Sequence, residues 1–128
     1  MLISMSRSPF FNDKHRFSTV VENLISNAIK YHKPKTNDNK HRFIKISGSC
    51  NSKALKLQIA DNGIGISSQH HEKIYDMYFR LSGQVSGSGI GLYIVKETIQ
   101  KLQGSISIDS EIGVGTTFTV LLKNWSDK

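Results

Sequence analysis

The pattern of apolar and polar positions predicts its clearest helix between Val20 and Tyr31, VVENLISNAIKY. At about 100° per residue, one face of this helix is apolar and the opposite face is polar. The apolar face carries Val21, Leu24, Ile25 and Ala28, and the polar face carries Asn23, Asn27, Lys30 and Tyr31. Asn12 or Asp13 can cap a helix that begins near Lys14. The pattern therefore predicts a helix with one face for the core and one face for a ligand or for solvent.

Period-two alternation predicts strands over 42–49, 54–60, 105–109 and 116–122. A second apolar helix is predicted over Leu92–Leu102, a polar helix over Ser67–Tyr75, and a mobile loop over Asp76–Ser86. Helices and strands do not alternate one for one, which favours a single layer of helices on one sheet. The predicted fold class is α+β, a two-layer sandwich with a mixed, mostly antiparallel sheet.

Composition and length are those of one ordinary globular domain. The chain has 128 residues, of which 38% are hydrophobic and 21% charged. We expect one domain over residues 1–128, with a core at about 13–123. No apolar run reaches the length of a membrane span and no signal peptide is apparent, so a cytosolic location is the default expectation. Whether a parent protein is anchored to a membrane is left open.

The charge and the cysteine count narrow the possible partners. Cys50 is the single cysteine, which excludes an internal disulfide and a cysteine-based metal site. The net charge of +7 suggests an affinity for anions, including nucleotide phosphate. Many positive charges lie between Lys30 and Lys45, but no aromatic residues interleave them as a stacking platform for nucleic acid would require. Nucleic acid is therefore not an expected partner.

Three glycine-bearing turns could bring backbone N–H groups close to a phosphate or a flat ring. They contain Gly63 with Gly65, Gly87 with Gly89 and Gly91, and Gly113 with Gly115. The second turn runs into a predicted helix N-terminus, which is a ready anion site. Asp61 precedes the first turn, where it could accept a hydrogen bond from an exocyclic amine or simply initiate the turn. Amide oxygens at Asn23 and Asn27 could ligate Mg²⁺.

Five segments in order, VVENLISNAIKY, DNGIGI, IYDMYFR, GSGIGLYIVKE and GVGTTF, resemble the N, G1, F, G2 and G3 boxes of a known family. That family is the catalytic, ATP-binding (HATPase_c) domain of the sensor histidine kinases of two-component systems. The resemblance spans Asp13 to Leu122. It implies the Bergerat (GHKL) fold, in which ATP lies between a sheet and its helices, in agreement with the fold class predicted above.

Carried over by position, the resemblance implies a site for ATP and Mg²⁺. Asn27 would ligate the metal with support from Asn23, and Lys30 would meet phosphate. Tyr31 would pack beside adenine and Asp61 would accept from its amino group. The remaining positions comprise base-pocket glycines and Ile66, the F-box aromatics, the arginine that reaches the γ-phosphate, the phosphate cradle and the far wall: Gly63, Gly65, Ile66, Tyr75, Tyr78, Phe79, Arg80, Gly87, Ser88, Gly89, Gly91, Leu92, Thr116 and Phe118. Asn23, Lys30 and Arg80 are the implied catalytic residues.

Asn23 favours phosphoryl transfer over hydrolysis. Hydrolysing members of the superfamily carry a general-base glutamate at this position, and the neighbouring Glu22 points about 100° away around the helix. The resemblance therefore implies transfer to a histidine on a separate phosphoacceptor domain, followed by relay to a response-regulator receiver domain. His71-Glu72 lacks the rest of a phosphoacceptor motif, so we expect the dimerisation domain and the sensor region to be absent from this chain. The isolated chain is expected to be a monomer and its parent a homodimer.

Two alternatives remain beside this reading. The glycines at 87, 89 and 91 with Asp109 could form a dinucleotide site, but a buried strand should precede them and Tyr78–Ser86 is polar. A nucleotide-sensing module without transfer activity is the second alternative, because binding residues alone do not establish transfer. The segment 81–86, LSGQVS, is short for the lid of this family, and we expect it to become ordered on nucleotide binding.

Overall fold

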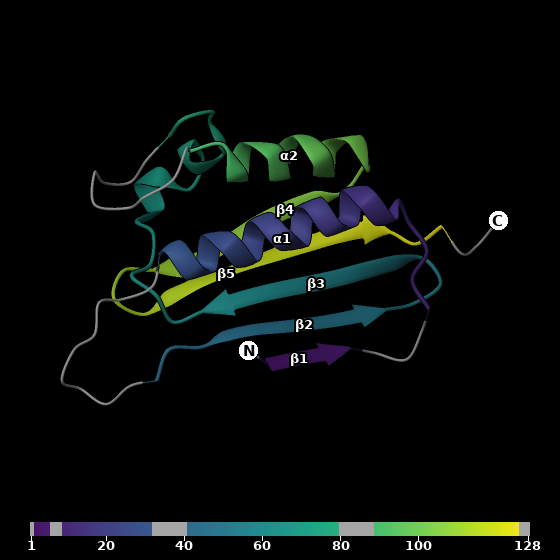
Figure 1. Ribbon diagram of the computed structural model, residues 1–128, viewed down its shortest axis with the longest axis horizontal. Coiled ribbons are helices and arrows are strands. Elements are labelled where there is room, and N and C mark those ends of the chain that lie inside the picture. The colour runs from purple at the N-terminus through teal and green to yellow at the C-terminus, as the bar shows by residue number, and fades with distance from the viewer. Residues whose placement is uncertain (1, 6–8, 32–40, 80–88, 126–128) are drawn as a thin grey trace.

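A computed structural model describes residues 2–5, 9–31, 41–79 and 89–125, with side chains from Pro9 onward. Two α-helices lie on one face of a single sheet, which makes the two-layer α+β fold that the sequence predicts (Figure 1). The elements are β1 (Leu2–Met5), α1 (Lys14–Lys30), β2 (Ile44–Cys50), β3 (Ala54–Asp61), the 3₁₀ helices η1 (Ser68–His70) and η2 (Lys73–Tyr75), α2 (Gly91–Lys101), β4 (Ser105–Glu111) and β5 (Gly115–Lys123). Within the described ranges, neither α-helix is long and apolar enough to cross a bilayer.

The sheet has the strand order β1-β2-β3-β5-β4. β1 pairs with β2 in parallel, and the other three pairs are antiparallel, so the sheet is mixed and mostly antiparallel as predicted. The strands β2 to β5 extend one or two residues beyond the predicted ranges at some ends. β1 has no counterpart among the predicted elements, because four residues are too few to display a period-two pattern.

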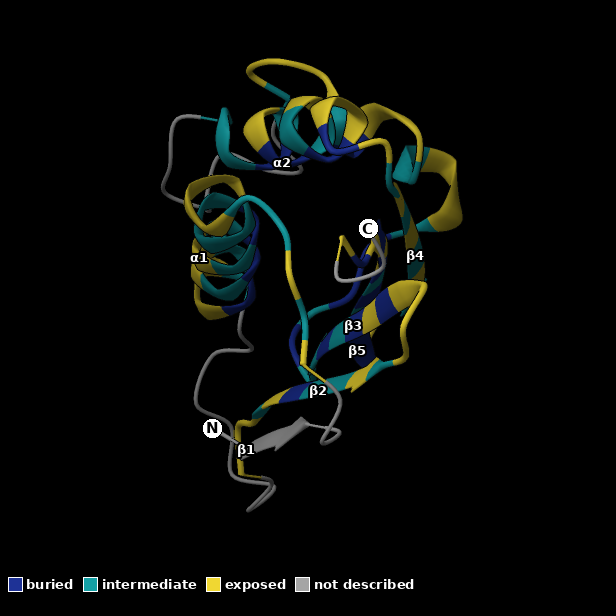
Figure 2. Ribbon diagram, turned by 90° about the vertical axis from the view of Figure 1, so that its right-hand side faces the viewer, coloured by how far each residue is buried: buried dark blue, intermediate teal, exposed yellow. Residues whose placement is uncertain are grey.

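The inner face of the sheet is apolar over most of its length and packs against both helices. Its rows run across β2, β3, β5 and β4, for example through Ile46, Ile59, Phe118 and Ile108. α1 contributes Val20, Leu24 and Ala28, and α2 contributes Leu92, Val95 and Ile99, all buried. Figure 2 shows the buried sides of both helices turned toward the sheet. This continuous apolar layer fixes the two helices relative to the sheet.

Both predicted α-helices are confirmed, whereas the third is wrong. α1 begins at Lys14, where the Asp13 carboxylate accepts a hydrogen bond from the Arg16 N–H at 3.0 Å, as expected of an N-cap. The predicted polar helix over 67–75 is replaced by η1 and η2. Ile74 is the single buried hydrophobic residue of this segment, so it has no apolar stripe that would hold a longer helix on the core.

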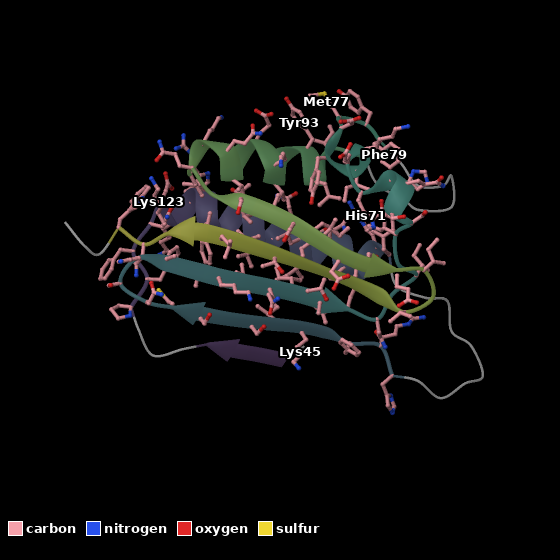
Figure 3. All side chains as sticks on the ribbon, turned by 180° about the vertical axis from the view of Figure 1, so that it is seen from behind. Lys45, His71, Met77, Phe79, Tyr93 and Lys123 are labelled. Atoms are coloured by element: carbon pink, nitrogen blue, oxygen red, sulfur yellow. The ribbon has the colours of Figure 1, made fainter. Side chains whose placement is uncertain are left out.

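The outer face of the sheet carries polar side chains and is turned toward the viewer in Figure 3, with α1 behind it. One row crosses the strands through Ser47, Gln58, Thr119 and Ser107. In this row the Gln58 amide donates to the Thr119 hydroxyl at 3.2 Å. Because the polar face and the apolar face alternate along each strand, the register places every second residue of β3 and β5 toward the helices.

A buried asparagine closes the end of the inner face that lies near the start of α1. Asn124 is 7% exposed, and its amide nitrogen donates to the Pro9 carbonyl at 3.0 Å and to the Asn51 carbonyl at 2.8 Å. The same nitrogen lies 3.2 Å from the Cys50 sulfur, and the amide oxygen accepts from the Phe11 N–H at 3.0 Å. Asn124 thus ties the segment before α1 to the β2–β3 turn and to the end of β5.

Candidate functional site

The polar face of α1 lies beside the start of α2. Asn23 is half-buried, and its amide nitrogen donates to the Thr19 carbonyl one turn earlier at 2.8 Å. Its amide oxygen faces α2 so closely that a Cβ on Gly91 would lie 3.3 Å from it. Asn27 is half-buried and Lys30 is exposed on the same face. The predicted N-box side chains are therefore placed together, with Asn23 anchored between two helices.

The turn after β3 packs against the C-terminal end of α1. The Ile64 N–H donates to the Tyr31 carbonyl at 3.0 Å. A Cβ on Gly63 would collide with the same carbonyl oxygen, so the backbones meet where only glycine fits. The Gly63 N–H in turn donates to the Asp61 carboxylate at 2.8 Å. These contacts bring Asp61 and Gly63 next to Tyr31, as the predicted site requires.

The same turn is joined on its other side to the β4–β5 hairpin. The Gly113 N–H donates to the Ile64 carbonyl at 2.9 Å. Gly65 has a φ of +78°, and a Cβ there would collide with the carbonyl oxygen of Glu111. The turn 61–66 is consequently held between α1 and the hairpin, and its shape is set by backbone contacts on both sides.

Three polar side chains interrupt the apolar inner face at this end of the sheet. The register pairs Asp61 of β3 with Thr116 of β5, and Thr116 with Ser110 of β4. The Ser110 hydroxyl lies 2.7 Å from the Thr116 hydroxyl, and it accepts from the Ile66 N–H at 2.7 Å. It also donates to the Gly115 carbonyl at 2.9 Å. Asp61, Thr116 and Ser110 are called the polar row below.

Burial governs the charge state of the carboxylate in the polar row. Desolvation raises the pKa of Asp61 above its ordinary value of 3.8, and backbone hydrogen bonds from Gly63 and Thr116 oppose part of this rise. A partly desolvated carboxylate is a strong hydrogen-bond acceptor. The row therefore places a partly desolvated carboxylate beside a buried hydroxyl.

The first backbone N–H groups of α2 receive no capping hydrogen bond from the side chain of the N-cap residue. Its N-cap residue, Ile90, makes no side-chain capping hydrogen bond. Because the first N–H groups of a helix have no partner within the helix and carry partial positive charge, this end suits an anion. Asn23 lies beside this end, through its approach to Gly91.

A backbone contact joins the end of the F box to Gly89, just before α2. The Tyr78 N–H donates to the Gly89 carbonyl at 2.8 Å. Gly89 has a φ of +74° and Tyr78 a φ of +67°, the latter in a region that a tyrosine rarely adopts. Gly89 is therefore positioned against the F box, near the start of α2.

Several predicted site residues are structural neighbours of the site and offer a ligand little surface. Ile66 and Phe118 are each 2% exposed, and Leu92 is 8% exposed, all within the core. Phe79 packs against the core and its ring lies 5.7 Å from that of His70. These residues pack in or against the core. The predictions for Arg80, Gly87 and Ser88 lie outside the described residues.

Of the two F-box tyrosines, one is exposed and the other lines an open pocket. Tyr78 is 65% exposed. Tyr75 lines an open pocket of about 580 Å³ whose other lining residues are His71, Glu72, Asp76, Met77, Tyr93, Lys96 and Glu97. The Lys96 ammonium lies 5.2 Å from the centre of the Tyr75 ring, and Figure 3 shows Met77 and Tyr93 on the outer side of α2. Tyr75 is the single residue that this pocket shares with the predicted site.

Ser110 is a site neighbour that the sequence reading missed. The predicted strand ends at Asp109 and the predicted connection begins at Glu111, so Ser110 belongs to neither, whereas β4 continues to Glu111. In the sequence SISIDSE, Ile106, Ile108 and Ser110 share one face. A serine at an inward position of an alternating strand is the signal that could have identified it, because inward positions are otherwise apolar.

Comparison with known proteins gives one family model and many relatives. Residues 12–125 match the model described as "Histidine kinase-, DNA gyrase B-, and HSP90-like ATPase". The chain is 35% identical over 117 residues to the sensor protein EvgS of Escherichia coli K12, covering 86% of this chain and 9% of that protein. It is 34% identical over 115 residues to the signal transduction histidine-protein kinase ArlS of Staphylococcus haemolyticus, covering 87% and 24%. The chain thus spans less than a quarter of either relative.

A solved structure reproduces the fold. The catalytic domain of the histidine kinase ThkA superposes with a TM-score of 0.77 at 21% sequence identity. The match covers 96% of this chain and 78% of that one. At this level of identity the likeness concerns the fold: the same two-layer arrangement of helices on a sheet.

Proposed function

Because the chain belongs to the family of histidine kinase-, DNA gyrase B- and HSP90-like ATPases, we propose that it is the catalytic, ATP-binding part of a two-component sensor histidine kinase. In this role it binds Mg-ATP and transfers the γ-phosphate to a histidine on a separate dimerisation domain. A receiver-domain aspartate of a response regulator then takes the phosphoryl group. The relatives named above, a sensor protein and a signal transduction histidine-protein kinase, support this assignment.

One observation carries the proposal: α1 is in contact with both the turn 61–66 and the start of α2, which are chemically different groups. The polar face of α1, the turn 61–66 and the uncapped N-terminus of α2 are linked by the Ile64–Tyr31 hydrogen bond and the approach of Gly91 to Asn23. A purine needs hydrogen-bond partners at its edge, and a triphosphate needs cationic or N–H groups. The polar row supplies the first and the α2 N-terminus with Lys30 supplies the second.

Each proposed role follows from a side chain's chemistry. Asp61 accepts from the exocyclic amine of adenine, and the half-buried ring of Tyr31 packs beside the base. Lys30 is exposed and can move to meet phosphate as a flexible point charge. Asn23 is tied to Thr19 and lies against the start of α2, beside which the phosphates would bind. The roles of Arg80, Gly87 and Ser88 in phosphate binding rest on the resemblance of their motifs.

The residues present fit a magnesium ion that is held chiefly by the nucleotide. No group of three or more His, Cys, Asp or Glu side chains able to hold a metal occurs among the described residues. Mg²⁺ characteristically takes one or two protein ligands beside phosphate oxygens and water. The half-buried amide of Asn27 offers one such oxygen. The ion would neutralise charge on the phosphates during transfer.

Transfer is favoured over hydrolysis by the absence of a base on the α1 polar face. Asn23 stands where a general base for water would stand, and an amide has no basic character at neutral pH. The chain's own neighbouring histidines are poor acceptors. The His71 ring nitrogen Nε2 is hydrogen-bonded to the Ile66 carbonyl at 2.9 Å, and His70 packs on Phe79. An imidazole on another domain is therefore the proposed nucleophile.

The proposed assembly follows from the placement of the ATP site and the acceptor histidine on separate domains. The parent kinase is proposed to be a homodimer held by its phosphoacceptor domain, with this chain as a monomeric unit when isolated.

A dinucleotide-binding role is disfavoured, because α2 leads into β4, an antiparallel strand, and not into the parallel strand of a βαβ unit.

The test of transfer mixes the chain with a dimerisation domain from a sensor kinase and ATP labelled at the γ-phosphate. Label on the acceptor histidine, acid-labile and dependent on this chain, is the expected result. Binding of ATP without any labelled acceptor, across acceptor domains from several relatives, would instead favour the nucleotide-sensing alternative.

The test of the metal assignment is Asn27→Ala. We expect this variant to lose the Mg²⁺-dependent part of its ATP affinity, about 10-fold or more, because one metal ligand is removed. Calorimetric titration with and without Mg²⁺ measures the loss. Ser26→Ala, an exposed neighbour on α1, is the matched control. An Asn27→Ala variant that keeps the full effect of Mg²⁺ would contradict the assignment.

A further inference from the structure

We infer that the end of the molecule opposite the proposed ATP site is a docking surface for an anionic lipid bilayer. Figure 1 shows the start of α1, the end of α2, the β2–β3 turn and the end of β5 gathered at this end, and Figure 2 looks onto it. We call it the basic end and define it by residues 9–16, 50–54, 100–105 and 121–125. The inference goes beyond the proposed function, because it involves none of the residues of the ATP site.

Hydrogen bonds and strand pairing join these four segments into one surface. The Trp125 N–H donates to the Phe11 carbonyl at 2.8 Å, which places the end of the described chain beside the segment before α1. The Lys123 ammonium donates to the amide oxygen of Gln103 at 3.1 Å, just after α2. Lys123 is also the register partner of Ala54, which follows the β2–β3 turn. Side chains from distant parts of the sequence therefore share this end.

Positive charge dominates the basic end. Its described residues include five lysine or arginine side chains, all exposed: Lys14, Arg16, Lys53, Lys101 and Lys123. They include one acidic side chain, Asp13, which lies 3.9 Å from the Arg16 guanidinium and so offsets only one of the five. The acidic side chains Asp61, Glu72, Asp76 and Glu111 belong to the turns and elements at the other end. A surface with this charge attracts anions.

The cations at the start of α1 do not stabilise that helix. Its first turn holds Lys14 and Arg16 and no acidic residue. Because the N-terminus of a helix carries partial positive charge, cations there interact unfavourably with the helix dipole. Asp13 relieves this in part, by capping the helix and by its approach to Arg16. An anionic surface outside the protein is the partner that such a first turn suits.

Apolar side chains are exposed among these cations. Phe11 is 53% exposed and Trp125 is 41% exposed, and their hydrogen-bonded backbones hold them next to each other. Leu121 is 45% exposed and lines an open pocket of about 270 Å³ beside Lys123. Aromatic side chains are favoured at the headgroup level of a bilayer, where their rings leave water and lysines meet lipid phosphates.

The arrangement of these groups favours a bilayer over nucleic acid. The cations are distributed over both helices, the β2–β3 turn and the end of β5, so they surround an end face. A flat anionic surface can meet all of them at once, each adding to the attraction. Single-stranded nucleic acid instead follows a positively charged groove with stacking platforms along it. Docking by the basic end would leave the turn 61–66 and the start of α2 facing away from the lipid.

The chain carries its own probe for this inference, because Trp125 is its only tryptophan. The purified chain is mixed with vesicles of phosphatidylcholine alone and with vesicles of equal parts phosphatidylcholine and phosphatidylserine. With the anionic vesicles we expect Trp125 emission to shift to shorter wavelength and to be quenched by lipids brominated on their acyl chains. Neutral vesicles should give neither effect, and added salt should reverse the binding.

Charge variants test whether the basic end is the surface that binds. Lys53→Gln combined with Lys101→Gln should weaken binding to the anionic vesicles about 25-fold, or about fivefold for each cation removed. Lys45→Gln combined with Lys73→Gln is the matched control, since it removes two exposed lysines from β2 and η2, outside the basic end. This control should bind within about a factor of two of wild type. Urea denaturation verifies that both double variants fold as wild type does.

Three results would overturn the inference and leave the proposed ATP site untouched. Equal weakening in the two double variants would show that net charge alone attracts the vesicles. Vesicle binding without any change in Trp125 emission would place the contact on another face. Binding of DNA or RNA by a chain that ignores anionic vesicles would assign the basic end to nucleic acid.

Discussion

The two ends of the sheet's inner face both bury polar side chains, and they differ in how those side chains are satisfied. At one end, Asn124 uses both polar atoms of its amide on neighbouring protein groups. At the other end, the Asp61 carboxylate accepts from the Gly63 N–H and the Thr116 hydroxyl contacts that of Ser110. Within the described residues, no side chain outside the polar row donates to either group. The apolar rows between the two ends carry the core.

We propose that this difference separates a structural cluster from a binding site. A buried polar group is costly when it is unpaired, so an amide that is fully paired within the protein contributes to stability. Under this proposal, Asp61 and Thr116, which Ser110 and the turn 61–66 hold in place, would gain their remaining partners from a ligand. Substitutions at the Asn124 end should therefore alter folding, and substitutions at the Asp61 end should alter nucleotide binding.

The largest expected effect is on folding. Asn124→Ala leaves the Phe11 N–H and the Pro9 and Asn51 carbonyls without their partner, and we expect it to lower the free energy of unfolding by about 3 kcal/mol. Urea denaturation measures this change. In the folded protein the ATP dissociation constant should stay within a factor of two of wild type. A large loss of affinity at unchanged stability would reverse the assignment of the two ends.

The second effect is on binding. Asp61→Asn replaces a carboxylate, whose two oxygens both accept hydrogen bonds, by an amide with one accepting oxygen. We expect about 30-fold weaker ATP binding, equivalent to about 2 kcal/mol. The free energy of unfolding should hold or rise slightly, because a partly desolvated charge is removed. Calorimetry and urea denaturation are measured on the same sample. Weaker folding with unchanged affinity would mean that Asp61 serves the turn and not the ligand.

A smaller effect is expected from pH. Because burial raises the pKa of Asp61 above 3.8, its carboxylate takes up a proton at a higher pH than an exposed aspartate does. Acidification through this range should weaken ATP binding, since the protonated group loses acceptor strength. The same protonation should favour the folded state, because a raised pKa means that the folded protein binds the proton more tightly than the unfolded chain.

The pH effect is read as the difference between wild type and Asp61→Asn, titrated in the same buffers, since adenine itself takes up a proton in acid. Wild type should lose affinity at higher pH than the variant does. Parallel pH profiles for the two proteins would show that the pKa of Asp61 has no part in binding.

Much of the fold could be predicted from the sequence because its pattern is local. The cap at Asp13, the apolar stripe of α1 and the alternation in β3 each lie within one element. The segment 67–75 was mispredicted as a helix because its polar residues fit a solvated helix as well as they fit two 3₁₀ turns. β1 was missed because its pairing partner, β2, lies about 40 residues away along the chain.

The candidate site was predictable where a motif carried it. Asp61, Gly63 and Tyr31 were named from their motifs, and the structure brings them together. Ser110 could not be named in this way, because its role depends on the register between β4 and β5 and on the approach of Ile66. Contacts that depend on strand register are set by tertiary packing, which a single sequence does not display.

The most direct measurement is a calorimetric titration of the chain with ATP, with and without Mg²⁺, and with NAD in parallel. The account predicts ATP binding that strengthens with Mg²⁺ and no heat from NAD. The reason is that the polar row would bind the adenine, while Asn27 and the α2 N-terminus would bind a metal-bound triphosphate. Binding of NAD in preference to ATP, or of neither, would contradict it.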